Sequence, residues 1–183
     1  MTSKYLLLIA IALPFFITSC SDKYSEQDKM QVINNVDTPF GAGLITFQIS
    51  PDTQLNSLND ISNSCTLLFL QASGKKTLQD LMNNPVLIKQ FFSGAGKIDG
   101  VLKVDKYVAM PGQETTLHID RSEGAKYVGI IAGYYPFPGK QHMVLLDIPV
   151  NVIEDGWWNK SLHVSLSPLF KKISMGKESI SIK

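Results

Sequence analysis

The chain of 183 residues has only two cysteines, three histidines and 18% charged side chains. Its formal net charge is +1, from 17 basic and 16 acidic residues. This balance excludes the strong positive field that nucleic-acid binding usually requires, so we expect no nucleic acid among its partners. An apolar content of 44% with so little charge also excludes an intrinsically disordered chain. The length suits one folded domain.

The start of the chain has the pattern of an export signal. Lys4 is followed by an apolar run over residues 5–17, which is shorter than the roughly 20 residues that a membrane-spanning helix needs. Residues 17–20 then place small side chains before a cysteine, as in a bacterial lipobox. We therefore predict a lipoprotein signal peptide over residues 1–19 and a covalent lipid on Cys20. The alternatives are an uncleaved anchor and an ordinary signal peptide with a chance cysteine.

The lipid would place the protein at a membrane. Ser21 follows the cysteine, as in lipoproteins that are sorted to the outer membrane, so we expect an outer-membrane protein that faces the periplasm. Loss of Lys4 with the signal peptide leaves equal numbers of basic and acidic side chains. Surface charge then supplies no attraction to an anionic membrane, and the acyl chains must hold the domain there. We expect no cofactor other than this lipid.

Lipidation of Cys20 leaves Cys65 as the one free thiol. An intramolecular disulfide is thereby excluded, although the protein is exported to an oxidising compartment. Cys65 opens an apolar run over residues 65–72, which predicts a small buried side chain rather than a nucleophile.

The rest of the chain is dominated by strand patterns. Residues 20–40 are mostly polar and predict a flexible tether that joins the lipid to the domain. Short apolar or alternating segments then recur between turn signals, which favours a β-sandwich or barrel. These segments are residues 44–49, 65–72, 102–108, 115–119, 126–135, 143–153, 162–167 and 180–182. The glycines inside 126–135 mark places where another backbone can come close.

One stretch breaks the strand pattern. Thr77 and Asp80 have the spacing of a capping box, and Asn84 with Pro85 predicts the start of a second helix. We therefore predict an all-β fold, a two-sheet β-sandwich over residues 41–183, with a helical insertion at about residues 75–96.

The chain has little that predicts catalysis. His118, His142 and His163 do not have the spacing of a metal motif, and no serine-hydrolase or zinc-protease motif is present. The glycines of residues 93–97 do not complete a phosphate-binding loop. A hydrolase built on scattered carboxylates is the least favoured hypothesis, and we expect neither an enzyme nor a metal site.

A long polar segment, residues 51–64, is the best candidate for a binding site. It carries apolar residues at helix-like spacing, and long loops without regular structure are often functional. Alternatively, it is a mobile loop whose apolar residues fold back on the core. The candidate partner-binding residues are Pro51, Asp52, Leu55, Asn56, Leu58, Asn59 and Ile61.

A different kind of binding site is also possible. Trp157 and Trp158 follow a turn, and an exposed tryptophan could contact a sugar or a peptide. The alternative function is therefore a periplasmic lipoprotein that binds a glycan or a peptide.

The two most distinctive segments come later in the chain, after the lipobox, after loop 51–64 and after the helical insertion. Residues 105–115 contain a Pro-Gly-Gln turn, and residues 125–134 contain Tyr-Val-Gly-Ile. In this order, the features resemble the outer-membrane lipoprotein of the type VI secretion system, the TssJ family, also called SciN or VasD.

This resemblance implies a transthyretin-like β-sandwich that is not an enzyme. It implies a structural protein that binds the periplasmic domain of TssM and so fixes the TssL–TssM complex to the outer membrane. In the family, the loop between the first two strands makes much of the TssM contact, and in this chain that loop is residues 51–64.

Overall fold

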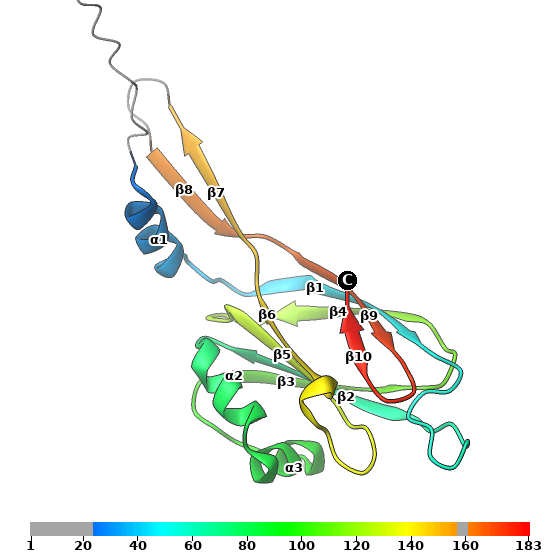
Figure 1. The fold of residues 1–183 in the computed structure, drawn as a ribbon. Coiled ribbons are helices and arrows are strands. Elements are labelled where there is room, and N and C mark those ends of the chain that lie inside the picture. Colours follow the sequence, from blue (N-terminus) through cyan, green and yellow to red (C-terminus); the bar gives the residue numbers. More distant parts are fainter. Residues whose placement is uncertain (1–23, 157–160) are drawn as a thin grey trace, which may run out of the picture.

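The computed structural model describes residues 24–156 and 161–183. Two four-stranded sheets pack against each other, and a two-stranded ribbon projects from one end of this sandwich (Figure 1). The predicted all-β sandwich with a small helical insertion is confirmed.

The first sheet has the strand order β10-β9-β1-β4. Its first strand, β1, pairs in parallel with β9, although more than a hundred residues separate them in the chain; the other pairs are antiparallel. The sequence patterns did not predict β9. The strands are β1 (Gly41–Pro51), β4 (Thr115–Arg121), β9 (Leu169–Met175) and β10 (Ile180–Ile182).

The second sheet has the order β3-β2-β5-β6 and is antiparallel throughout. Its strands are β2 (Cys65–Ala72), β3 (Val101–Ala109), β5 (Tyr127–Ala132) and β6 (Met143–Asp147). Helices α2 (Lys75–Met82) and α3 (Pro85–Ser93) cover the face of this sheet that points away from the sandwich (Figure 1).

Strand β2 lies between two apolar clusters, which explains its continuous apolar sequence. Successive side chains of a strand point to opposite faces of the sheet. Leu67 and Phe69 therefore point into the sandwich, where the rings of Phe69 and Phe47 stack with centroids 5.0 Å apart. Leu68 and Leu70 point outward and pack under α2 and α3.

The two helices of the insertion begin differently from each other. Asn84 caps α3 as predicted, because its side-chain oxygen accepts hydrogen bonds from two backbone N–H groups of the first turn. Gly94 ends that helix in the left-handed conformation, at φ 87°. The predicted capping box at Thr77 is wrong, because α2 already begins at Lys75 and its N-cap, Gly74, has no side chain to accept a bond.

Gly129 lies in β5 and Gly133 lies just after it, and both allow a neighbouring part of the chain to come close. A Cβ atom on Gly133 would lie 3.2 Å from the carbonyl oxygen of Thr66, so another backbone is close there, as predicted. At Gly129 the close neighbour is instead a helix side chain, since a Cβ would lie 2.8 Å from Cε of Met82. Gly129 thus leaves room for α2 on the sheet.

The predicted single strand over residues 143–153 is two strands. β6 ends at Asp147, and β7 (Val150–Asp155) leaves the sandwich and pairs with β8 (Ser161–Leu166) to form the ribbon. Pro149 lies at the break, where the absence of a backbone N–H removes a ladder hydrogen bond.

A third helix, α1 (Glu26–Asn34), lies beside the ribbon (Figure 1). Ser25 and Asp28 form a reciprocal capping box at its start, and hydrogen bonding to Ser25 lowers the pKa of Asp28. Lys29 lies 3.4 Å from Glu154 of β7. The segment predicted as a flexible tether therefore contains a helix that packs on the folded domain.

Candidate partner-binding surface

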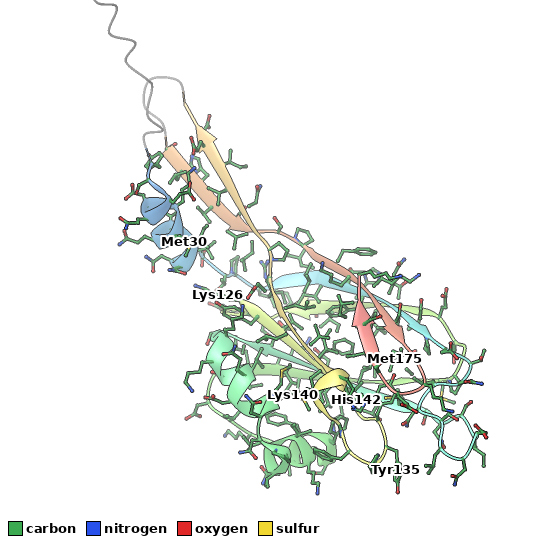
Figure 2. All side chains as sticks on the ribbon, in the orientation of Figure 1. Met30, Lys126, Tyr135, Lys140, His142 and Met175 are labelled. Atoms are coloured by element: carbon green, nitrogen blue, oxygen red, sulfur yellow. The ribbon has the colours of Figure 1, made fainter. Side chains whose placement is uncertain are left out.

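Three segments that are distant in the sequence meet at the end of the molecule opposite to the ribbon. They are loop 51–64, the β5–β6 connection (residues 133–142) and the β9–β10 turn (residues 176–179) (Figure 1). Figure 2 labels Tyr135, Lys140 and His142 of the connection and Met175, which precedes the turn.

Asn56 ties loop 51–64 to the β5–β6 connection. Its side chain is 8% exposed, and its amide nitrogen donates to the carbonyl oxygen of Ser64 at 3.0 Å. Its amide oxygen accepts from the backbone N–H of Tyr135 at 2.9 Å. The residue has φ 46°, a left-handed conformation that asparagine tolerates better than most residues. Asn56 is thus a structural residue of the surface, because its amide is occupied inside the protein.

Three other predicted binding residues, Leu55, Pro51 and Asp52, have structural roles in the loop. Leu55 is fully buried in the core, so its prediction as an apolar anchor for a partner is wrong. Pro51 is buried at the end of β1. Asp52 is exposed, but its carboxylate accepts from the backbone N–H of Gln54 at 2.7 Å and thereby shapes the turn.

The exposed apolar part of loop 51–64 is a tight hairpin. Leu58 and Ile61 exchange two backbone hydrogen bonds of 3.0 Å, and Asn59 and Asp60 between them both have positive φ, at 50° and 58°. Positive φ at both central residues is the requirement of a type I′ turn. The helix-like spacing was therefore misleading. Leu58 is 44% exposed and Ile61 is 68% exposed, and we refer to these two side chains as the apolar tip.

His142 joins the β5–β6 connection to the β9–β10 turn, a role that the sequence patterns did not predict. It is 5% exposed, and its Nδ1 accepts from the backbone N–H of Gly139 at 2.8 Å. This bond leaves the proton on Nε2, which donates to the carbonyl oxygen of Glu178 at 2.7 Å.

Tyr134 reinforces the same junction. Its hydroxyl lies 2.9 Å from the carbonyl oxygens of Gly176 and Ser179 in the turn. Burial raises the pKa of Tyr134 above the ordinary tyrosine value, so the hydroxyl keeps its proton and acts as the donor. The sequence offers no local pattern for these bonds, because backbone carbonyls of a distant segment accept them.

A cleft of about 320 Å³ lies between the apolar tip and these two junctions. We refer to it as the tip cleft. Tyr135 is 64% exposed beside it, and Lys177 of the turn lies 3.6 Å from Asp60 in an exposed ion pair. The residues that line it include Asn56, Leu58, Tyr135, Phe137, His142 and Lys177.

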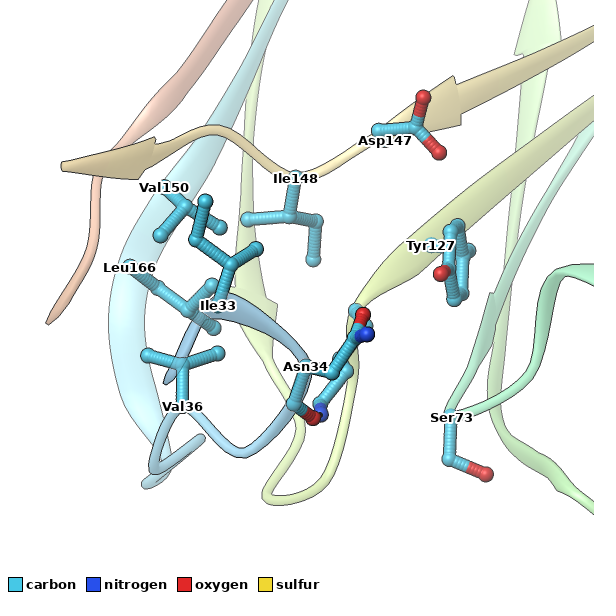
Figure 3. A pocket seen from close by; sticks show the side chains of 10 residues that line it. Ile33, Asn34, Val36, Ser73, Tyr127, Asp147, Ile148, Val150 and Leu166 are labelled. Atoms are coloured by element: carbon cyan, nitrogen blue, oxygen red, sulfur yellow. Dashed lines mark hydrogen bonds between the residues drawn. The ribbon is translucent and has the colours of Figure 1, made fainter. Parts of the chain in front are cut away.

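A second cavity, of about 370 Å³, lies where α1 meets the base of the ribbon (Figure 3). Apolar side chains such as Ile33, Val150 and Leu166 lie on one side of it. Of its charged groups, Lys126 donates to the carbonyl oxygen of Asn34 at 2.6 Å, and Asp147 pairs with a lysine of α2. These contacts join α1 and the helical insertion to the sandwich, so the cavity is best explained as a packing junction.

The other candidates of the sequence analysis have simple explanations. His118 and His163 are exposed, as predicted. Cys65 is 1% exposed, and burial raises its thiol pKa to about 12, as expected for a small core side chain. Cys20, Trp157 and Trp158 lie outside the described residues.

Within residues 24–156 and 161–183, His, Cys, Asp and Glu side chains form no group of three or more that could hold a metal ion. No helix in the same part of the chain has both the length and the apolar content needed to span a membrane.

The chain is similar in fold to solved structures of type VI secretion proteins. Serratia marcescens Lip, described as a membrane-bound component of the system, matches with a TM-score of 0.57 and 16% identity, over 76% of this chain and 96% of that one. TssJ1 of Pseudomonas aeruginosa matches with a TM-score of 0.50 and 15% identity, over 80% and 95%. A structure described as the TssM C-terminal domain from EAEC matches with a TM-score of 0.54 and 12% identity, over 76% and 96%.

At the level of sequence, a comparison with curated proteins found no significant match. The profile of a protein family does match, over residues 45–168, and it describes the type VI secretion lipoproteins VasD, EvfM and TssJ. The match covers the second sheet, the helical insertion, most of β1 and all of β4 in the first sheet, loop 51–64 and the β5–β6 connection, and it ends before β9. This chain belongs to the type VI secretion lipoprotein family.

Proposed function

We propose that this lipoprotein is anchored to the outer membrane through acyl chains on Cys20 and binds the periplasmic domain of TssM. It would thereby fix the TssL–TssM complex to that membrane. The observation that carries the proposal is the exposure of Leu58 and Ile61 on an ordered hairpin of loop 51–64. In the family, the corresponding loop makes much of the TssM contact.

The position of α1 supports this arrangement. Cys20 precedes Glu26 by six residues, which span at most about 20 Å. Helix α1 lies beside the ribbon, and loop 51–64, which carries the apolar tip, lies at the opposite end of the molecule (Figure 1). An anchor at Cys20 would therefore keep the ribbon end near the membrane and leave the tip free for a partner in the periplasm.

The chemistry of the tip suits a protein partner. Two apolar side chains are surrounded by polar residues such as Asn59, Asp60 and Lys177, which is the usual anatomy of an interface. Complete burial of one large aliphatic side chain contributes roughly 1.5–3 kcal/mol. The membrane anchor adds to this by raising the effective concentration of the domain.

A binding experiment with the full-length lipoprotein in detergent tests the proposal. We expect Leu58→Asp with Ile61→Asp to weaken binding of the purified TssM periplasmic domain by at least tenfold, because both charges would be buried at the contact. Val86→Asp is the matched control, since Val86 is 64% exposed but lies on α3. Equal affinity of the wild-type chain and the tip variant would overturn the TssM contact at this site.

The anchor is tested separately. Cys20→Ser removes the thiol that accepts the lipid, so we expect no incorporation of labelled palmitate and loss of the protein from the outer-membrane fraction. Normal fractionation of this variant would contradict anchoring through Cys20.

A further inference from the structure

The tip cleft lies directly beside the apolar tip and is built from three separate segments. Leu58 of the tip lines one side of it, Tyr135 and Phe137 of the β5–β6 connection line another, and Lys177 of the β9–β10 turn completes it. Tyr135 is the most exposed aromatic side chain among these, at 64%. The apolar surface therefore continues from the tip onto the connection.

The walls of the tip cleft are held in place by buried hydrogen bonds. Asn56 fixes the backbone of Tyr135 at 2.9 Å. His142 fixes the backbone of Glu178 at 2.7 Å. Because these bonds already order the three segments, a ligand that enters the cleft would not have to order them, which favours affinity.

Three polar side chains of the tip cleft already have partners. Both amide atoms of Asn56 and both ring nitrogens of His142 are hydrogen-bonded inside the protein. Lys177 pairs with Asp60. These three side chains are therefore not free to bind a sugar or an ion, whereas an apolar side chain needs no polar partner. At about 320 Å³, the cleft is large enough for a single large side chain.

We infer that the tip cleft receives one aromatic or large aliphatic side chain of the TssM periplasmic domain, with Tyr135 as a second contact next to the apolar tip. This inference rests on the proposed function. It extends the docking surface from loop 51–64 to a segment about 75 residues later in the chain, Tyr135 to Phe137. An interface anchor of this kind usually sits in a preformed pocket and dominates the binding energy.

Substitutions at Tyr135 in the full-length lipoprotein test the inference, by titration with the TssM periplasmic domain. We expect Tyr135→Ala to weaken binding by about tenfold, equivalent to about 1.4 kcal/mol, because the tip cleft loses the aromatic ring that lines one side of it. Tyr135→Phe keeps the ring and should stay within about twofold of the wild type, since the hydroxyl is not used. Phe170→Ala is the matched control, because Phe170 is 59% exposed on β9 of the other sheet. All variants should keep the wild-type melting temperature.

The outcomes separate this inference from the proposed function. Loss of binding in the Leu58→Asp and Ile61→Asp variant with unchanged affinity of Tyr135→Ala would overturn the cleft contact and leave the TssM role standing. Unchanged affinity in both would overturn both. A steep fall of affinity with salt would also contradict an apolar occupant, since salt screens charge pairs and not apolar contacts. Tyr135-dependent self-association without TssM would assign the cleft to a second copy of the chain instead.

Discussion

The imidazole ring of His142 stacks on the phenol ring of Tyr134, with ring centroids 4.5 Å apart and planes inclined by 19°. Each ring also bonds the β9–β10 turn, through the carbonyl oxygens of Glu178, Gly176 and Ser179. The pair therefore holds the turn against the β5–β6 connection and gives the tip cleft a rigid wall.

We expect His142→Ala to lower the free energy of unfolding by about 2–3 kcal/mol, because two hydrogen bonds and an aromatic contact are lost. Urea denaturation measures this change. His118→Ala is the control, since that ring is exposed and its Nδ1 hydrogen-bonds the exposed Thr46 Oγ1 at 3.1 Å. Its effect should stay below about 0.5 kcal/mol. Equal effects of the two substitutions would contradict the role of His142.

Asn56 offers a second test of the surface. We expect Asn56→Ala to destabilise the protein by about 2 kcal/mol, since it leaves Tyr135 N–H and Ser64 C=O without partners and places alanine at positive φ. Asn59→Gly should leave stability unchanged or slightly higher, because Asn59 also has positive φ but is exposed. Thermal unfolding, followed by circular dichroism, compares the two variants. An unchanged melting temperature of Asn56→Ala would contradict the role of Asn56 in fixing the loop.

The cap of α3 can be distinguished from the cap that the sequence suggested for α2. Asn84→Ala removes the acceptor for two N–H groups and should cost about 1 kcal/mol of stability. Thr77→Ala should lower the stability less, because Thr77 is the third residue of α2 and not its N-cap. Urea midpoints of the two variants rank these effects, and the reverse order would contradict the helix boundaries.

The buried thiol of Cys65 predicts a pH dependence. Its pKa is raised from 9.0 to about 12. The thiol is therefore neutral in both folded and unfolded chains below about pH 8 and contributes no slope there. Between pH 9 and 12 the unfolded chain ionises first, and stability should fall by up to about 1.4 kcal/mol per pH unit. Tyr134, whose pKa is also raised, adds to the fall at higher pH.

Urea denaturation at several pH values checks this slope, and Cys65→Ala should reduce it. In a Cys20→Ser background, a thiol reagent at pH 8 should modify Cys65 only after unfolding. Rapid modification of the folded chain would show that the thiol is accessible, against the 1% exposure.

Several features of this protein were readable from its sequence because local chemistry determines them. The continuous apolar run of β2 predicted a buried strand, and Asn84 with Pro85 predicted the start of α3. The polar character of loop 51–64 marked the segment that forms the candidate surface. The arrangement of its side chains was not readable, since Leu55 is buried and Leu58 is exposed despite one shared spacing.

Other features were settled only by the tertiary structure. The alternation of β9 is obscured because Phe170 is exposed and Lys171 lies on the face of the buried Leu169 and Ile173. Its parallel partner β1 lies more than a hundred residues earlier. Asn56 also bonds the backbone of Tyr135, and His142 bonds the backbone of Glu178; no periodicity in the sequence records contacts between such distant segments. Sequence patterns report which side chains prefer burial along one strand or helix. Only the packed chain decides which distant segments meet, because those contacts depend on the closure of the whole sandwich.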